Sequence, residues 1–388
     1  MKLFLYLKHF PPQDGRPNEG ATKFVHGLAS GLTTCGAEVI VLCEGVERVS
    51  VQTPEGYQVE CFANPKSQPS FNLAPALKDY AATHMQDSLV ILNGMFHLSV
   101  YALSRLLRQY QVPYIVSPLD PYHPSIFSKN ANLKWPYWYL LEQRLLKQAT
   151  AIQLLDIRHT EWLRRLGIKT STIATPCGYF QQDVHPESTL KYRESDNPTL
   201  FFLGRLDAYN KGLDILLEAF SQIKKISNAQ LVIQGPDWGD RKQLEAQANQ
   251  LGLSSQVTFL DPDFDASPST LIANYDVFCI PSRFEGFSQS ALEAMLSGRV
   301  LLISEIAGIT PFVKASNCGI VVKPEVTSIK SGFLELLERR SEWKEMGLRG
   351  RQYVLENLDW KTIALQALKQ YKQIYSSAHK ATQGKIVV

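Results

Sequence analysis

The feature that most constrains the fold is a regular alternation of short apolar runs with amphipathic stretches along the chain. Runs of four or five residues rich in Val, Ile, Leu and Phe predict buried strands, and the stretches between them place apolar residues at helical spacing. Such an alternation predicts parallel sheets built from strand–helix–strand units. The clearest runs cover residues 3–7, 39–43, 89–92, 114–117, 199–203, 230–233, 277–280 and 300–304.

The alternation is interrupted once, by a polar, proline-flanked segment. Because 388 residues exceed the size of one typical core, this interruption predicts a linker between two domains. We therefore expect an α/β protein of two doubly wound, Rossmann-like domains that face each other across a cleft, with ligands at the carboxyl ends of the strands. The expected division is an N-terminal domain over 1–180, a linker over 181–198, a C-terminal domain over 199–358, a last helix over 360–376 and a weakly patterned tail over 377–388.

Composition argues against several classes of protein. A net charge of +3 is far from the basicity of a nucleic-acid binder. No two of the six cysteines form a CxxC pair, which argues against a zinc site or a disulfide framework and favours free thiols in a reducing compartment. No apolar run approaches the length of a membrane span, and the apolar start over 3–7 is too short for a secretion signal. We expect a cytoplasmic protein that binds no nucleic acid.

The first candidate site is the segment FFLGRLDAYNKGLDILLEAF, residues 201–220. An expected strand ends at Leu203, Gly204 and Arg205 follow it, and Lys211 precedes a clear helical pattern. Two fixed cations beside a helix N-terminus suit a diphosphate, and the glycine lets the backbone come close to it. The alternative is a pair of solvated surface cations.

The second candidate site is EGFSQSALEA, residues 285–294, which places Glu285 and Glu293 on either side of a turn. Ser288 can cap a helix that starts at about Gln289, and the free N–H groups of a helix start suit a phosphate. A carboxylate offers two acceptor oxygens, so Glu293 can bind a vicinal diol such as a ribose, and Glu285 can bind a second sugar. The alternatives are the acid and nucleophile of a glycoside hydrolase, or ordinary exposed helix residues.

These two segments resemble the donor-binding domain of retaining GT-B glycosyltransferases, specifically family 4 (group 1). That family carries two glutamates separated by seven residues, present here as Glu285-GFSQSAL-Glu293, and a GR-x5-KG segment, matched from Gly204 onwards. Residues 300–313 resemble the strand and glycine loop that follow, with Gly308 in the usual place.

The first half of the chain carries the same resemblance more thinly. Residues 19–32 resemble the family's N-terminal glycine loop and first helix, and residues 93–120 resemble its middle segment. The segments SPLDP and WPYWYLLEQRLLKQATAIQ, residues 117–121 and 135–153, are most similar to bacterial exopolysaccharide glycosyltransferases. A terminal helix opened by Trp360 fits a family in which that helix returns to the first domain.

The resemblance implies a reaction and a set of roles. A hexose would pass, with retention of anomeric configuration, from a nucleotide-diphosphate sugar in the second domain to an acceptor in the first. Arg205 and Lys211 would stabilise the charge on the departing diphosphate, which is electrostatic catalysis that can replace a metal. The implied catalytic residues are Arg205, Lys211, Glu285 and Asp120, where Asp120 contacts hydroxyls. The implied donor-binding residues are Gly20, Gly204, Arg205, Lys211, Glu285, Gly286, Phe287, Ser288 and Glu293, where Glu293 holds the ribose and Gly20 shapes the wall near the phosphates.

The resemblance also implies partners. The expected donor is a UDP-sugar, UDP-glucose first, and the expected acceptor is a saccharide or a lipid-diphosphate-linked sugar in exopolysaccharide or cell-envelope polysaccharide synthesis, with no metal and no cofactor. Residues 131–148 are aromatic and then basic, which suits a peripheral contact with the inner surface of a membrane. The alternative for this segment is a core helix with a solvated basic face. DPDFD, residues 261–265, offers a superficial metal motif that we interpret as a solvated turn.

Three positions depart from the family pattern. Glu19 stands where the family has the first of two glycines, Leu119 stands where many members have a histidine, and Ser288 replaces a glycine. His123 is the candidate substitute for the missing histidine. These departures leave open a catalytically weak sugar-nucleotide-binding subunit. The competing enzymatic activities are those of a GT-B nucleotide-sugar epimerase, a phosphorylase and a glycoside hydrolase.

Overall fold

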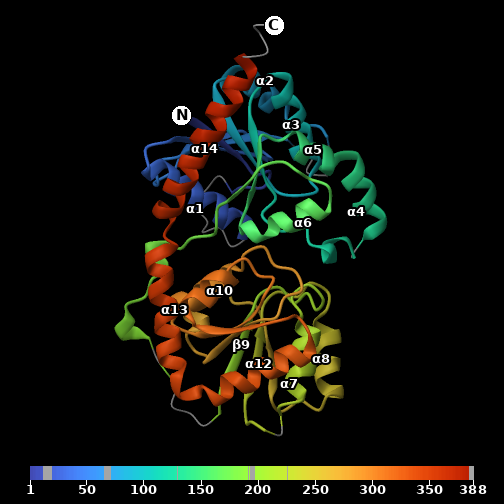
Figure 1. Ribbon diagram of the computed structural model, residues 1–388, viewed down its shortest axis with the longest axis vertical. Coiled ribbons are helices and arrows are strands. Elements are labelled where there is room, and N and C mark those ends of the chain that lie inside the picture. Colours follow the sequence, from blue (N-terminus) through green and yellow to red (C-terminus); the bar gives the residue numbers. More distant parts are fainter. Residues whose placement is uncertain are drawn as a thin grey trace. The chain divides into compact units, whose positions relative to one another are not determined.

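The structure, a computed structural model, describes residues 1–11, 20–64, 71–128, 130–190, 192, 197–224 and 226–383. The chain forms two compact units, Met1–Gly178 together with Trp360–Val388, and Tyr179–Asp359 (Figure 1). Each unit contains one sheet with parallel strands and helices between them, so the expected class of two doubly wound α/β domains is confirmed.

The first unit is built on an eight-stranded sheet in the order β3-β4-β2-β1-β5-β6-β7-β8. The strands are β1 (Lys2–Tyr6), β2 (Glu38–Gly45), β3 (Val49–Gln52), β4 (Gln58–Ala63), β5 (Ser88–Asn93), β6 (Tyr114–Ser117), β7 (Ala151–Leu154) and β8 (Thr172–Ala174). The pair β3–β4 is antiparallel and the other pairs are parallel, so the expectation of a purely parallel sheet is wrong at this edge. The turn between β3 and β4 is too short for a parallel crossover and long enough for a hairpin.

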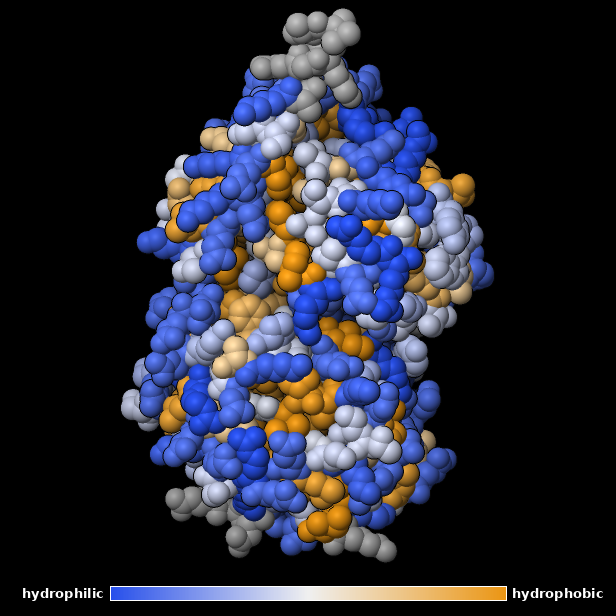
Figure 2. Space-filling model, viewed as in Figure 1, coloured by the Kyte–Doolittle hydropathy of each residue, from blue (hydrophilic) through white to orange (hydrophobic). Residues whose placement is uncertain are grey.

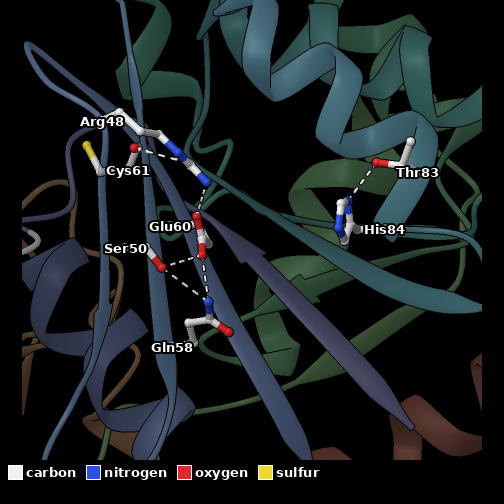
Figure 3. Close-up of polar contacts among 7 residues, drawn as sticks. All are labelled: Arg48, Ser50, Gln58, Glu60, Cys61, Thr83 and His84. Atoms are coloured by element: carbon white, nitrogen blue, oxygen red, sulfur yellow. Dashed lines mark hydrogen bonds and ion pairs between the residues drawn. The ribbon is translucent and has the colours of Figure 1, made fainter.

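A buried carboxylate ties this hairpin together (Figure 3). Glu60 on β4 is 4% exposed, and its Oε1 accepts hydrogen bonds from Ser50 Oγ and Gln58 Nε2, each at 2.6 Å. Its Oε2 pairs with Arg48, which also donates to the carbonyl of Cys61 at 3.3 Å. Both oxygens therefore have partners, as a buried charge requires, and the group holds the edge of the sheet rather than a ligand.

The helices of the first unit include the last one in the chain. They are α1 (Gly20–Thr34), α2 (Pro75–His84), α3 (Leu98–Gln109), α4 (Ala131–Tyr137), α5 (Gln143–Gln148), α6 (Thr160–Arg165) and α14 (Trp360–Gln383), with the π-helix η2 (Trp138–Glu142) and the 3-10 helices η1 (Pro124–Phe127) and η3 (Ile157–His159). Figure 1 shows α14 beside α1, and two glycines explain the contact. A Cβ on Gly27 would lie 2.0 Å from the Trp360 ring, and one on Gly31 would lie 2.4 Å from the Trp360 carbonyl.

The helix α14 is longer than expected, because the predicted tail over 377–388 begins with helix as far as Gln383. The residues after Tyr375 include Ala, Lys and Gln, which favour helix, and neither Gly nor Pro occurs before Gly384. A helix already nucleated against the first unit extends easily through such residues.

The second unit is built on a six-stranded, fully parallel sheet in the order β11-β10-β9-β12-β13-β14. The strands are β9 (Thr199–Leu203), β10 (Gln230–Gln234), β11 (Val257–Leu260), β12 (Val277–Ile280), β13 (Val300–Ser304) and β14 (Gly319–Val322). The helices are α7 (Leu213–Ser221), α8 (Arg241–Gln250), α9 (Pro268–Ile272), α10 (Gln289–Leu296), α11 (Thr310–Ser316), α12 (Val326–Glu338) and α13 (Trp343–Asn357), with the 3-10 helices η4 (Gln181–Asp183), η5 (Glu187–Thr189) and η6 (Arg340–Glu342). The strand order reverses between β9 and β12, and open α/β sheets bind ligands at such a reversal.

The segment expected to be a linker, 181–198, packs on the second unit where the structure describes it. His185 Nε2 lies 3.0 Å from Ser269 Oγ, and the carbonyl of His185 accepts a hydrogen bond from the buried Arg351. The Tyr192 ring lies under the guanidinium of Arg299 at 5.0 Å. Side chains of this polar segment, which the sequence predicts to be a linker, thus find specific partners on the unit that follows it.

Candidate functional site

The two sequence motifs meet at the strand-order reversal of the second unit, because the loops after β9 and β12 are joined. Gly212, which precedes α7, has φ +67°, and a Cβ there would lie 2.3 Å from the carbonyl of Pro281. The backbone N–H of Arg283 donates to the carbonyl of Asn210 at 3.0 Å, and the guanidinium of Arg283 makes two bonds of 2.7 and 2.8 Å to Asp214. A glycine and a bidentate ion pair therefore fix one motif against the other.

Lys211 and Glu285, one from each motif, form an ion pair at the centre of this contact. Lys211 Nζ lies 2.7 Å from Glu285 Oε2, and the two side chains are only 18% and 12% exposed. Ser282 Oγ donates to the same carboxylate oxygen at 3.1 Å. Because partial burial weakens screening by water, this pair is stronger than a surface pair. The charge of Lys211 is therefore balanced within the protein itself.

Arg205 is held differently. Its guanidinium lies over the ring of Trp238, 4.9 Å from the ring centroid, and both residues are exposed. Within the described part of the chain its guanidinium makes no hydrogen bond and no ion pair. The sequence predicted two fixed cations in this loop. The structure pairs Lys211 with a carboxylate, and among the described residues it gives the Arg205 guanidinium no such partner.

Gly204 serves the packing of two loops. Its N–H donates to the carbonyl of Gln234 at 3.1 Å, at the end of β10. Gly235 has φ +149°, and a Cβ there would lie 2.0 Å from the carbonyl of Gly204. The loops after β9 and β10 can approach this closely only because position 235 lacks a side chain.

The start of α10 is fixed from two sides. Ser288 caps the helix, because its Oγ accepts from the N–H of Ala291 at 3.4 Å, and its φ of +82° explains why the family pattern has glycine at this position. Phe287 is buried, packs edge-to-face on Phe312 at 6.0 Å, and accepts a hydrogen bond from the N–H of Ile309 at 3.1 Å. The loop after β13, which contains Gly308, therefore supports the backbone at 286–288.

Glu293 lies inside α10 and is 8% exposed. A carboxylate with so little exposure is expensive unless it is hydrogen-bonded, so it is not an ordinary solvent-facing helix residue. Glu285, by contrast, lies on the loop, as the sequence predicts. The two glutamates are separated by the helix start, whose free N–H groups favour an anion.

The remaining predicted residues lie in the first unit. Gly20 is the first residue of α1 and is exposed, and a Cβ there would meet no described atom within 4 Å. Asp120 is exposed in the loop after β6, next to Leu119, whose φ is +69°. Glu19 lies outside the described residues. Gly20 and Asp120 thus belong to the first unit, whereas the cluster of the other predicted residues is built within the second.

His123, the candidate for the missing histidine, has a local partner. Its Nδ1 accepts the N–H of Ser125 at 3.3 Å and lies 2.7 Å from that residue's Oγ, so it caps η1. Its ring meets the Trp162 ring edge-to-face at 4.5 Å. Burial, followed by the charges of His159 and Arg165, lowers its pKa. The Nδ1 atom therefore has a capping role in the first unit.

A further buried carboxyl group of the first unit was not predicted from the sequence. Glu142, at the end of the π-helix, has no exposed surface, and its Oε1 accepts from Tyr122 Oη at 2.5 Å and from the N–H of Phe96 at 3.1 Å. Burial raises its pKa to about 7, while these two hydrogen bonds lower it. Glu142 thus connects the loops that follow β5 and β6.

The segment 261–265 forms a turn, as interpreted from the sequence. Asp263 Oδ1 accepts the N–H groups of Asp265 and Ala266, each at 3.0 Å, and Asp261 pairs with Arg241. In the described ranges, no group of three or more His, Cys, Asp or Glu side chains is arranged to hold a metal ion.

Two further parts of the site were missed by the sequence reasoning. The Arg283–Asp214 pair joins residues 69 apart, and no local pattern indicates that pairing. Trp238 did leave a signal, because an exposed aromatic within the turn-forming sequence GPDWGD is unusual for a loop without a ligand or partner.

Comparisons with known proteins show similarity to glycosyltransferases. Residues 187–353 match the model of the family described as Glycosyl transferases group 1. An uncharacterized glycosyltransferase of Methanocaldococcus jannaschii is 28% identical over 96% of this chain and 98% of its own length. The phosphatidyl-myo-inositol mannosyltransferase of Mycobacterium leprae is 28% identical over 47% of this chain and 48% of its own.

Solved structures share the fold at lower identity. Sucrose-phosphate synthase from Thermosynechococcus elongatus has a TM-score of 0.78 at 19% identity, covering 97% of this chain and 99% of that one. Anabaena HepE, in complex with UDP and glucose, has a TM-score of 0.71 at 18% identity, covering 96% of this chain and 100% of that one. Both units therefore share the GT-B architecture.

Proposed function

We propose that this chain, whose residues 187–353 match the model of the group 1 glycosyltransferases, is a retaining, metal-independent enzyme that transfers a hexose from a UDP-sugar to a saccharide or lipid-linked acceptor. The observation that carries the proposal is the convergence of Arg205, Lys211, Glu285 and the start of α10 at the strand-order reversal of the second sheet. UDP-glucose is the expected donor, and the complexes of HepE with UDP-glucose and with UDP and glucose support that choice.

The proposed chemistry places the diphosphate between the loop after β9 and the start of α10. Breaking the bond between the anomeric carbon and the diphosphate leaves negative charge on the leaving oxygen. Fixed cations and helix N–H groups stabilise that charge without reorganising, and this is an effective form of electrostatic catalysis. Arg205 and Lys211 supply the cations, so the proposal needs no metal ion. No side chain is assigned as a nucleophile.

The ion pair between Lys211 and Glu285 suggests how the sugar is recognised. Glu285 Oε2 already accepts from Lys211 and from Ser282, so its other oxygen is available to hydroxyls of the transferred hexose. Glu293 is proposed to bind the ribose, and Asp120 and Gly20 are proposed to contribute from the first unit. In this proposal Glu285 binds the sugar and Lys211 binds the diphosphate. Because the two residues form one ion pair, recognition of the two parts of the donor is coupled.

The acceptor is proposed to reach the enzyme at a membrane surface in exopolysaccharide or cell-envelope synthesis. The helix α4 has no buried residue, so the alternative of a core helix is wrong there, whereas Leu145 and Leu146 of α5 are buried, as that alternative expects. Leu133, Tyr139 and Leu140 are 69%, 65% and 70% exposed, and Arg144 and Lys147 are exposed beside them. Figure 2 shows apolar surface on the side of the first unit where α4 is labelled in Figure 1.

Exposed apolar side chains next to cations suit the interface of an anionic membrane. Within the described residues, no helix has the length and apolar character to cross a membrane. Sedimentation with vesicles of phosphatidylglycerol and of phosphatidylcholine checks the contact: the wild type should bind the anionic vesicles, and the double variant Leu133→Ser, Leu140→Ser should bind them at least several-fold more weakly. Equal sedimentation of both proteins would contradict the membrane proposal.

The reaction is tested with radiolabelled UDP-glucose, membrane extract as the source of acceptor, and EDTA. The proposal expects label in a saccharide or lipid fraction, an α-linkage by NMR, and no dependence on magnesium. Epimerised free donor without acceptor would indicate an epimerase, and donor binding without any turnover would indicate a catalytically weak subunit. Cleavage of oligosaccharides without a nucleotide would indicate a hydrolase.

A further inference from the structure

We propose that Trp238 is a positioning residue that holds the guanidinium of Arg205 ready to receive the donor's diphosphate. The inference rests on the proposed function, because it takes the diphosphate as the ligand of Arg205. Its basis is the placement of the guanidinium over the Trp238 ring at 4.9 Å, in a loop whose position relative to Arg205 is fixed.

The fixed position comes from the backbone. The loop after β10 runs alongside the loop after β9, with Leu206 paired to Asp237 in a parallel bridge. The N–H of Leu206 donates to the carbonyl of Pro236 at 2.9 Å, and the N–H of Ala208 donates to Asp240 Oδ2 at 2.8 Å. Contacts on both sides of Trp238 therefore fix its backbone relative to the loop that carries Arg205.

The far side of the Trp238 loop is also held. Asp237 Oδ1 accepts the N–H of Gly239 at 2.8 Å and the N–H of Arg241 at 3.1 Å, which ties the loop to the start of α8. Gly239 has φ +102°, a conformation that glycine adopts without strain. Trp238 thus lies at the tip of a short loop that is anchored before and after it, although the residue is 55% exposed.

The chemistry of the pair suits a phosphate ligand. An arginine held over an aromatic ring by a cation–π contact spends none of its five N–H donors on a hydrogen bond to that partner, so the donors remain available to an anion. The same contact restricts a long side chain that otherwise samples many rotamers, so less freedom is lost when the anion binds. The ring supplies a surface without neutralising the charge, which a carboxylate partner would do.

The contrast with Lys211 supports this assignment. Lys211 is positioned by Glu285 at 2.7 Å, and that carboxylate offsets its charge. Arg205, by contrast, is positioned by the uncharged Trp238 ring, so its full charge remains for the ligand. Stacking of the nucleobase on Trp238 is the competing role, and it becomes an outcome of the test.

The test is a double-mutant cycle with Trp238→Leu, Arg205→Met and the combined variant, measured by calorimetry with UDP and with uridine. An exposed cation–π contact predicts that Trp238→Leu weakens UDP binding by about two- to fivefold. Uridine lacks the diphosphate, so its affinity should not change. In the Arg205→Met background the loss of Trp238 should have no further effect on UDP. Trp238→Phe, which keeps a ring, should retain most of the affinity.

Equal losses for UDP and uridine, or additive effects in the cycle, would overturn the inference and indicate stacking on the base or a general effect on the loop. Melting temperatures of the four proteins show whether the loop itself is intact. If the proposed function is wrong, the result differs: either the wild type does not bind UDP, or Arg205→Met leaves UDP affinity unchanged. Inorganic pyrophosphate, used in the same cycle, tests the coupling independently of the base.

Discussion

Replacing Ser288 by glycine and by alanine separates two effects at the start of α10. The residue combines φ +82° and ψ +86° with a capping hydroxyl on the N–H of Ala291. A non-glycine residue in such a conformation carries strain of about 1–3 kcal/mol. Glycine removes the strain, but it costs about 0.5–1 kcal/mol in backbone entropy and a few tenths through the lost cap.

The balance favours glycine by about 1 kcal/mol. Alanine keeps the strained backbone and loses the cap, so Ser288→Ala should lower the free energy of unfolding by about 1 kcal/mol. For a unit of this size each kcal/mol corresponds to about 2–4 °C in the melting temperature. In differential scanning calorimetry, the variant with glycine at position 288 should therefore have the highest melting temperature, the wild type the next, and the variant with alanine the lowest. The backbone N–H at 288 remains in every variant, so UDP affinity should change little.

The reasoning fails if Ser288→Ala melts at or above the wild type, or if Ser288→Gly melts below Ser288→Ala. The first result would show that the hydroxyl does not cap the helix. The second would show that the backbone at this position is relaxed with a side chain present, in which case the conformation assigned to Ser288 is wrong.

Three other predictions concern the contacts around the two motifs and the first unit. Gly212→Ala should destabilise the second unit by more than about 2 kcal/mol and weaken UDP binding, because its Cβ would lie 2.3 Å from the Pro281 carbonyl; unchanged melting would contradict this. Glu285→Gln should lower the transfer rate by about 10–100-fold, because the carboxylate proposed to bind the hexose loses its charge. UDP carries no hexose, so its affinity should not fall; lost UDP binding at an unchanged rate would refute the assignment. Burial raises the pKa of Glu142 from 4.5 to about 7, so between these pH values the folded protein holds a proton that the unfolded chain releases. The contribution of this group to the free energy of unfolding is therefore fully present below about pH 4.5 and is lost as the pH rises through about 7. Glu142→Gln should flatten that dependence in urea titrations between pH 5 and pH 8, and an equally steep dependence in the variant would count against it.

Much of the fold could be predicted because buried parallel strands leave a strong local signal. The runs at 114–117, 199–203, 277–280 and 300–304 match β6, β9, β12 and β13 residue for residue. The hairpin of β3 and β4 was missed because its first strand alternates intermediate and exposed residues and lacks an apolar run. The last helix was predicted too short because its final turns contain few apolar residues.

The positions of the two motifs could be predicted from the sequence, whereas the contacts between them could not. The position of the two motifs after β9 and β12 follows from local patterns, and the strand order then brings them together. The ion pair of Lys211 with Glu285 depends on a backbone approach at Gly212 that only the tertiary structure reveals. The placement of Arg205 on Trp238 likewise depends on two loops whose contact no sequence spacing specifies.

The central claim is that the strand-order reversal of the second unit holds the nucleotide diphosphate of a sugar donor. Titration calorimetry with UDP, GDP, ADP and CMP, with and without magnesium, tests it most directly on the wild type and Glu293→Ala. The account predicts that UDP binds, that magnesium has no effect, and that the variant loses about 1–3 kcal/mol of binding free energy through its ribose contacts. Absence of binding by every nucleotide, or equal affinity in the variant, would contradict the account.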